Sequence, residues 1–322
     1  MLASYYGCLT ATWKYDREVE FFWISGILLV IVGIFGIIGT ILALVVLCRS
    51  QLKRKVFYQL LIGLASFDLL FIASYGVCVG YRGLACTPVS LNIYFVTYPI
   101  LNIGFAGSIF MTVAISIERY IGVCHPNVAV RKKASVFIVP VLLLTFLFTL
   151  PRLVEKSFKV VNGTIVQEKM WWAETEMYKV GYYLWANIIV LSIIPTLSLV
   201  FFNAAIIKEL WKSSQSLRMF GVHHKKRDRK SLKILFCIVS LFLVCHCPRI
   251  VYRLLYYLSY DNREYWWSIV PIYKLALVLN SSTNCLIYYF AGDVVQTHCS
   301  KLFCKQLCSK HIDKDNVNVQ VI

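Results

Sequence analysis

Residues 22–48, FWISGILLVIVGIFGIIGTILALVVLC, decide the class of fold. None of these 27 residues is charged. An α-helix rises about 1.5 Å per residue, so about 20 such residues cross the hydrocarbon core of a bilayer. The run is also too long for the apolar core of a signal peptide. We therefore predict that it forms a transmembrane helix.

Six further stretches are similarly apolar, at residues 56–81, 91–117, 134–150, 180–207, 234–259 and 266–290. The whole chain is 59% hydrophobic and only 15% charged, too little charge to cover a water-soluble protein. The two-residue alternation of a transmembrane β-barrel is missing, so each segment must satisfy its backbone as a helix. We predict an all-α membrane protein with a seven-transmembrane helix bundle at residues 22–290, which excludes a soluble enzyme.

The net charge of +17 is a signal of membrane orientation. The loops after the first, third and fifth segments and the carboxyl-terminal tail hold 21 Lys and Arg residues, whereas the opposite flanks hold nine. Positive loops stay in the cytosol. We predict an extracellular N-terminus at residues 1–21, a cytoplasmic C-terminus and no nucleic-acid binding. The sequon Asn162-Gly163-Thr164 then lies outside, where Asn162 is a predicted glycosylation site.

Residues 291–308, after the last segment, show apolar side chains at helical spacing with lysines between them. This pattern predicts a short amphipathic helix on the cytosolic membrane surface. Cys304 and Cys308 are candidate palmitoylation sites there. The polar residues 309–322 are predicted to be a disordered cytoplasmic tail.

Asp68 lies near the middle of the second segment, where an ionisable group is costly and therefore a functional candidate. The seventh segment repeats polar residues every four positions, which places them on one helical face. Oxygen ligands of this kind suit a sodium ion, and a hydrated network that holds the helices together is the alternative. The candidate ligands are Asp68, Ser108, Asn280, Ser281 and Asn284.

Three basic residues, Arg249, Arg253 and Lys274, lie in the outer halves of the sixth and seventh segments. If they share a vestibule, they attract an anionic group of a ligand. For Arg253, the alternative to a place in the vestibule is that its side chain extends outward and pairs with an acid of the neighbouring loop. In the loop before the fifth segment, Glu176 is a candidate contact for basic residues of a peptide.

Glu118-Arg119-Tyr120 ends the third segment, and at this point the chain resembles a class A, rhodopsin-like G-protein-coupled receptor. Cys245-His246-Cys247-Pro248 resembles the CWxP motif of the sixth helix in that family, and Asn284-Cys285-Leu286-Ile287-Tyr288 resembles the NPxxY motif of the seventh. The resemblance implies that Glu118 holds Arg119 at rest and that Arg119 is released toward a heterotrimeric G protein on activation. It also assigns activation roles to Tyr120, His246, Pro248, Asn284 and Tyr288, and a sodium pocket to the residues around Asp68.

The chain departs from the family pattern at several positions. Thr40 replaces the usual Asn, His246 the Trp, Cys285 the Pro and Asn203 the Tyr. The disulfide usual in the family cannot form, because Tyr94 occupies the helical position and residues 152–179 contain no cysteine. We expect a bridge between Cys8 and Cys86 instead; pairing of Cys78 with Cys86, and free thiols, are the alternatives.

Within class A, Leu150-Pro151-Arg152-Leu153-Val154-Glu155 resembles the end of the fourth helix in invertebrate FMRFamide-type receptors. Leu101 stands where amine receptors have Asp, which disfavours a biogenic amine. The resemblance implies a plasma-membrane neuropeptide receptor that needs no cofactor beyond the possible sodium ion and is not an enzyme. The alternatives are a class A receptor for a non-peptide anionic ligand, and a seven-helix transporter or channel. An amidated Arg-Phe peptide end is cationic, which conflicts with the basic vestibule.

Overall fold

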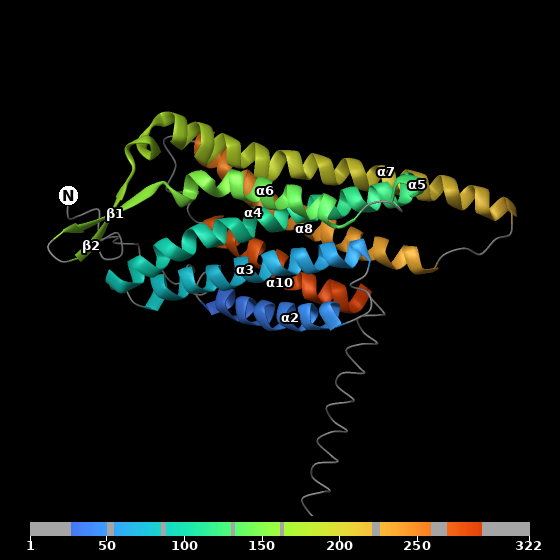
Figure 1. The fold of residues 1–322 in the computed structure, drawn as a ribbon, viewed down its shortest axis with the longest axis horizontal. Coiled ribbons are helices and arrows are strands. Elements are labelled where there is room, and N and C mark those ends of the chain that lie inside the picture. The colour runs from blue at the N-terminus through green and yellow to red at the C-terminus, as the bar shows by residue number, and fades with distance from the viewer. Residues whose placement is uncertain are drawn as a thin grey trace, which may run out of the picture.

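A computed structural model describes residues 27–49, 55–84, 88–129, 133–161, 164–220, 226–258 and 269–291. Seven long helical segments lie roughly side by side in a bundle (Figure 1). They are α2 (Leu29–Arg49), α3 (Val56–Leu84), α4 (Pro88–Cys124), α6 (Ser135–Leu153), a fifth segment that includes α7 (Ile194–Phe220), α8 (Lys226–Leu258) and α10 (Ile269–Ala291). The predicted seven-helix bundle is confirmed.

Apolar side chains cover both the inside and the outside of this bundle. In α2, Gly36 and Ala43 are buried against other helices, whereas Ile34 and Ile38 are more than half exposed. Leu143 and Leu147 of α6 likewise face outward, 57% and 62% exposed. Exposed residues of this kind on every helix are expected only when lipid surrounds the protein. Six of the described segments are long and apolar enough to cross a membrane; α10 is not among them and carries the polar residues 280–284.

Helices α3 and α4 form the most extensive contact in the bundle. Their close approach depends on Gly104, because a Cβ atom placed there would lie 2.6 Å from the backbone nitrogen of Phe71. Helix α10 packs against α2, α3 and α8, which closes the ring. Gly36 of α2 allows the contact with α10, since a Cβ there would overlap Ser282.

The fifth segment begins as two π-helical stretches, η4 (Met177–Ala186) and η5 (Ile189–Ile193), before α7 continues it. Pro195 follows directly and lacks a backbone N–H, so it cannot donate to the carbonyl one turn earlier. Wider turns relieve such a local mismatch. The apolar pattern of residues 180–207 predicted the span but not its π-helical part.

A β-hairpin precedes the fifth segment, formed by β1 (Lys156–Val161) and β2 (Thr164–Lys169). The strands are antiparallel, with Lys156 opposite Lys169 and Val161 opposite Thr164. The all-α prediction for the bundle is correct, but this hairpin was missed. Its signal was present, because Asn-Gly between β-branched residues is the strongest short hairpin pattern. We call this side of the bundle the hairpin end; the single-turn helix α5 (Pro126–Ala129) lies at the opposite end (Figure 1).

The helix ends extend beyond several predicted spans. The third predicted span, for example, is the central part of α4, whereas α8 begins eight residues before the sixth predicted span and ends with it to within one residue. The predicted N-terminal region at residues 1–21, the tail at residues 309–322 and all but the first residue of the predicted surface helix fall outside the described residues.

Candidate functional site

Asp68 is fully buried in α3 and collects donors from two other helices. Ser108 Oγ of α4 donates to Asp68 Oδ1 at 2.6 Å, and Asn284 Nδ2 of α10 donates to Oδ2 at 2.7 Å. Ser281 also hydrogen-bonds to this carboxylate. Asn280 is buried on the same helix. Four of the five predicted sodium ligands are therefore joined in one network, and Asn280 lies beside it without being one of the described partners of Asp68.

The surroundings of Asp68 fit a small cation. Within the described part of the chain, the buried Asn284 Oδ1 has no hydrogen-bond partner, and neither has the buried hydroxyl of Tyr288. An anionic carboxylate beside hydroxyls and an unused amide oxygen is an oxygen-rich set that suits a hard ion or ordered water.

Arg119 and Glu118 form a bidentate ion pair at the end of the bundle opposite the hairpin. Arg119 Nε donates to Glu118 Oε2 at 2.5 Å and Nη2 donates to Oε1 at 2.6 Å. The guanidinium lies 4.3 Å from the ring centroid of Phe57. Tyr120 points elsewhere, to the rings of His125 and Phe202. The predicted pairing of Arg119 with its acidic neighbour is thus present.

His246 is buried in the middle of α8 between aromatic rings. It stacks on Phe242 at a centroid distance of 3.9 Å and on Phe105 of α4 at 5.8 Å. Of the described residues, none hydrogen-bonds to His246 Nδ1. The imidazole therefore stands at the position of the Trp in the CWxP motif and packs there by stacking on the neighbouring rings.

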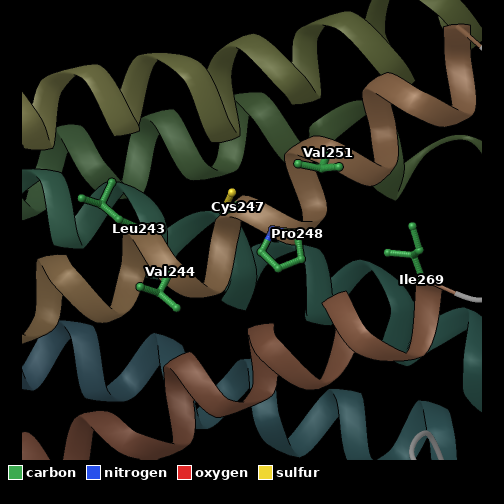
Figure 2. Close-up of a pocket in the computed structure, with 6 residues that line it drawn as sticks. All are labelled: Leu243, Val244, Cys247, Pro248, Val251 and Ile269. Atoms are coloured by element: carbon green, nitrogen blue, oxygen red, sulfur yellow. The ribbon is translucent and has the colours of Figure 1, made fainter.

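Pro248 lies two residues after His246 and faces an apolar groove between α8 and α10. Figure 2 shows this groove of about 680 Å³, lined by Leu243, Val244, Cys247, Pro248, Val251 and Ile269. Val244 is 70% exposed, which places the groove on the lipid-facing surface rather than in the bundle.

Arginines from two helices meet near the hairpin end of the bundle. Arg249 of α8 is 4% exposed, and its guanidinium lies 4.4 Å from the ring centroid of Phe105. One turn later, Arg253 donates to the backbone oxygen of Tyr183 at 3.1 Å. Both act electrostatically on each other, on Arg152 of α6 and on Tyr273 of α10. The structure thus brings together two of the three predicted basic residues and adds a third arginine.

Arg152 is the centre of a polar network that the sequence analysis did not predict. It donates to the hydroxyl of Tyr98 in α4 and to Asn187 Oδ1 of the fifth segment. Its guanidinium also lies 4.5 Å from the ring centroid of Tyr183. In the sequence, Arg152 was noted only as part of the Leu-Pro-Arg ending of the fourth helix. That ending indicated a family and gave no structural role for Arg152.

Glu155 extends this network to the hairpin. Tyr178 Oη donates to Glu155 Oε2 at 2.5 Å, and Lys156 Nζ lies 4.0 Å from Oε1. The backbone oxygen of Glu155 accepts from Met170 N at 2.9 Å, directly after β2. Hydrogen bonds thus join the hairpin to the bundle.

The other residues that were predicted to contact the ligand are Leu101, Lys274 and Glu176. Leu101 is partly buried and packs against the core. Lys274 is partly buried beside Tyr273, whose ring stacks on Tyr252. Glu176 is exposed and pairs with Lys179 at 3.7 Å.

Comparison with known proteins decides the family of this bundle. The sequence model described as 7 transmembrane receptor (rhodopsin family) matches residues 39–288. The chain belongs to this rhodopsin family. Rhodopsin-family receptors are multi-pass membrane proteins and are not enzymes.

Several relatives of this rhodopsin-family receptor are peptide receptors. It is 26% identical to an FMRFamide receptor of Drosophila melanogaster, over 92% of this chain and 56% of the relative. It is also 26% identical to an FMRFamide peptide receptor of Caenorhabditis elegans, over 81% of this chain and 65% of the relative. A third relative, the S-geranylgeranyl-glutathione receptor of Homo sapiens, is 26% identical over 81% of this chain and 74% of the relative. The chain spans less than two thirds of the length of the two FMRFamide receptors.

Several predicted sites of the receptor fall outside the described residues. They are the glycosylation site Asn162, the bridge between Cys8 and Cys86, and the palmitoylation sites Cys304 and Cys308. Cys78 is described, and its Sγ lies 3.1 Å from Thr97 Oγ1.

Proposed function

We propose that this rhodopsin-family receptor is a plasma-membrane receptor for a neuropeptide of the FMRFamide-like class, and that it signals through a heterotrimeric G protein. The observation that carries this proposal is the bidentate ion pair of Glu118 and Arg119, placed at the opposite end of the bundle from the hairpin. Two relatives named as FMRFamide receptors support the peptide class.

The ligand binds at the hairpin end, which faces the outside of the cell in this proposal. Arg249, Arg253 and Lys274 meet its acidic groups, and Leu101 contributes an apolar contact. Glu176 is 80% exposed, so a basic residue of a peptide can displace its surface ion pair with Lys179 at little cost. A peptide with both kinds of charge satisfies both surfaces.

The opposite end faces the cytosol. Ligand binding shifts the population of receptors toward a state in which Arg119 leaves Glu118 and contacts the G protein. His246 and Pro248 lie in the middle of α8, between the two ends of the bundle. The His246 ring stacks on Phe105, and the Arg249 guanidinium lies over the same Phe105 ring. His246 therefore links the ligand end to the middle of α8. Tyr120, Asn284 and Tyr288 belong to the same machinery in this proposal.

Sodium binding near Asp68 is part of the proposal. Asp68, Ser108, Ser281 and Asn284 would hold the ion, with Asn280 adjacent. A bound cation would neutralise a carboxylate that is otherwise buried among neutral groups. It would thereby stabilise the resting packing of α3, α4 and α10.

A second candidate function is a receptor for a non-peptide anionic ligand. The buried arginines Arg152 and Arg249 favour it. Among the described residues, the one carboxylate near them is that of Glu155, which is already bound by Tyr178 and Lys156. One relative is named for a glutathione conjugate rather than for a peptide.

The test is a screen of a neuropeptide library against cells that express the full chain, followed by nucleotide exchange on a purified G protein. We expect at least one peptide to promote exchange in the wild type. In Arg119→Gln, exchange should be lost while binding of the same peptide is retained. Activation by anionic small molecules alone would instead support the second candidate.

A further inference from the structure

We infer that Arg249 is the core of an anion-binding subsite that takes a carboxylate of the ligand. The inference rests on the proposed receptor function and narrows its ligand to one with an acidic group at its inserted end. An FMRFamide-like peptide would therefore reach Arg249 with an acidic residue and not with its cationic, amidated end.

The first step is the state of the Arg249 side chain. It is 4% exposed, and its Nη1 has no hydrogen-bond partner among the residues that the structure describes. A guanidinium stays charged in a protein, so it cannot avoid the cost of burial by losing its proton. Its ring contact with Phe105 offsets only part of that cost. Within the part of the chain that the structure describes, Arg249 therefore has no counter-charge.

The second step is that neighbouring charges increase the need for an anion. Arg253 and Arg152 both act on Arg249 with like charge. The buried carboxylates of the described chain are those of Asp68 and Glu155. Asp68 is engaged by donors from α4 and α10, and Glu155 by Tyr178 and Lys156.

The third step contrasts Arg249 with Arg152, which is buried to a similar degree. Arg152 has Tyr98, Asn187 and the ring of Tyr183 as partners, so it is part of the framework. Arg249 has unused donors, and a guanidinium offers a fork that fits the two oxygens of a carboxylate. The two arginines therefore have different roles despite the same charge.

The fourth step concerns the acids of the loop after α8, such as Asp261 and Glu264, which lie outside the described residues. Arg249 is nine residues before the end of α8 at Leu258, which is about 13 Å of helix. Side chains of a helix also lean toward its N-terminus, which for α8 is away from this loop. Arg253 is closer to the end of α8 and therefore to the acids of this loop. Arg249 is deeper in the bundle, so its guanidinium can bind the anionic group of a ligand that enters there.

The Arg249 subsite is coupled to the middle of the receptor. The Phe105 ring lies under the Arg249 guanidinium and also stacks on His246. A carboxylate that draws the guanidinium away from Phe105 changes the packing of His246. Binding of the anion and movement of α8 are thereby linked through one ring.

The test uses the purified full chain in detergent and two probes, 4-phenylbutyrate and its neutral amide 4-phenylbutyramide. The aromatic ring of the probes suits a site beside the Phe105 ring, and the two probes share one carbon skeleton and differ only in carrying a carboxylate or a neutral carboxamide. We expect the carboxylate to raise the thermal unfolding midpoint by a few degrees and the amide to leave it unchanged. In Arg249→Gln, this difference should disappear.

The unliganded variants give a second, independent readout. Arg249→Gln removes a buried charge without a partner, so the midpoint should equal or exceed that of the wild type. Arg152→Gln is the matched control and should lower the midpoint, because it removes the hydrogen bonds to the Tyr98 hydroxyl and to Asn187 Oδ1. Equal effects of the two probes, including no effect of either, would overturn the inference. A fall in the Arg249→Gln midpoint as large as that of Arg152→Gln would show a native partner and also overturn it.

The same variants separate this inference from the proposed function. If peptides activate the receptor and Arg249→Gln does not change their potency, the subsite is wrong while the receptor function stands. If no peptide activates it but the carboxylate probe acts through Arg249, the neuropeptide assignment fails and the subsite stands.

Discussion

Replacement of Gly104 by Ala tests the close packing on which the Asp68 network depends. A Cβ atom at this position would lie 2.6 Å from Phe71 N and 2.9 Å from Phe71 Cα. Ordinary contact begins near 3.4 Å, so α3 and α4 would have to move apart by about 0.8 Å. Because the obstacle is backbone, no change of rotamer relieves it.

Such overpacking costs about 1–3 kcal/mol, and the better helix propensity of Ala returns about 1 kcal/mol. We expect a net loss of stability of up to about 2 kcal/mol, which lowers the unfolding midpoint by up to about 6 °C. The midpoint can be followed with a dye that reacts with thiols as they become exposed, because Cys245 and Cys285 are buried in the folded receptor.

The matched control is Gly76→Ala in α3, where a Cβ would meet nothing within 4 Å. This variant should keep or slightly raise the midpoint. Ser108 follows Gly104 by one turn, so Gly104→Ala should also lengthen its 2.6 Å hydrogen bond to Asp68. Equal midpoints for the two alanine variants would refute the reasoning about helix contact.

Three further substitutions probe the other parts of the molecule. Asp68→Asn should abolish the stabilisation of the purified receptor by sodium over potassium, and an unchanged sodium response would exclude the ion site. Tyr178→Phe removes the hydrogen bond to Glu155 and should cost about 1–3 kcal/mol because the acceptor is charged; Tyr257→Phe, at an exposed position, is the control and should have no effect on the midpoint. Arg119→Gln should leave peptide affinity within about threefold while nucleotide exchange falls to the background rate, and a parallel loss of affinity would contradict a role confined to coupling.

The helices were predictable because lipid imposes a minimum length and excludes charge, so residues 22–48 and six similar runs identified the bundle. Asp68 was predictable for the same reason, since a carboxylate at that depth needs partners. The four-residue spacing from Asn280 to Asn284 then indicated where some of them lie. These inferences needed only local sequence and the properties of a bilayer.

The network around Arg152 was not predictable in this way. Its partners Tyr98 and Asn187 are separated from it by 54 and 35 residues, and nothing in the local sequence of either indicates the contact. Arg152 lies at the end of an apolar run, where a basic residue ordinarily reaches the membrane surface. The β-hairpin was missed for another reason, because its Asn-Gly signal lies in a loop outside the apolar spans.

Cys285 has a mechanical consequence for the seventh helix. It occupies the position where related motifs carry Pro, and its Sγ donates to the backbone oxygen of Ser282 at 3.1 Å. Unlike Pro, it also retains a backbone N–H that can continue the hydrogen-bond ladder of α10. This half of α10 is therefore rigid. The bending that a moving helix requires occurs in α8, where Pro248 interrupts the backbone hydrogen bonds.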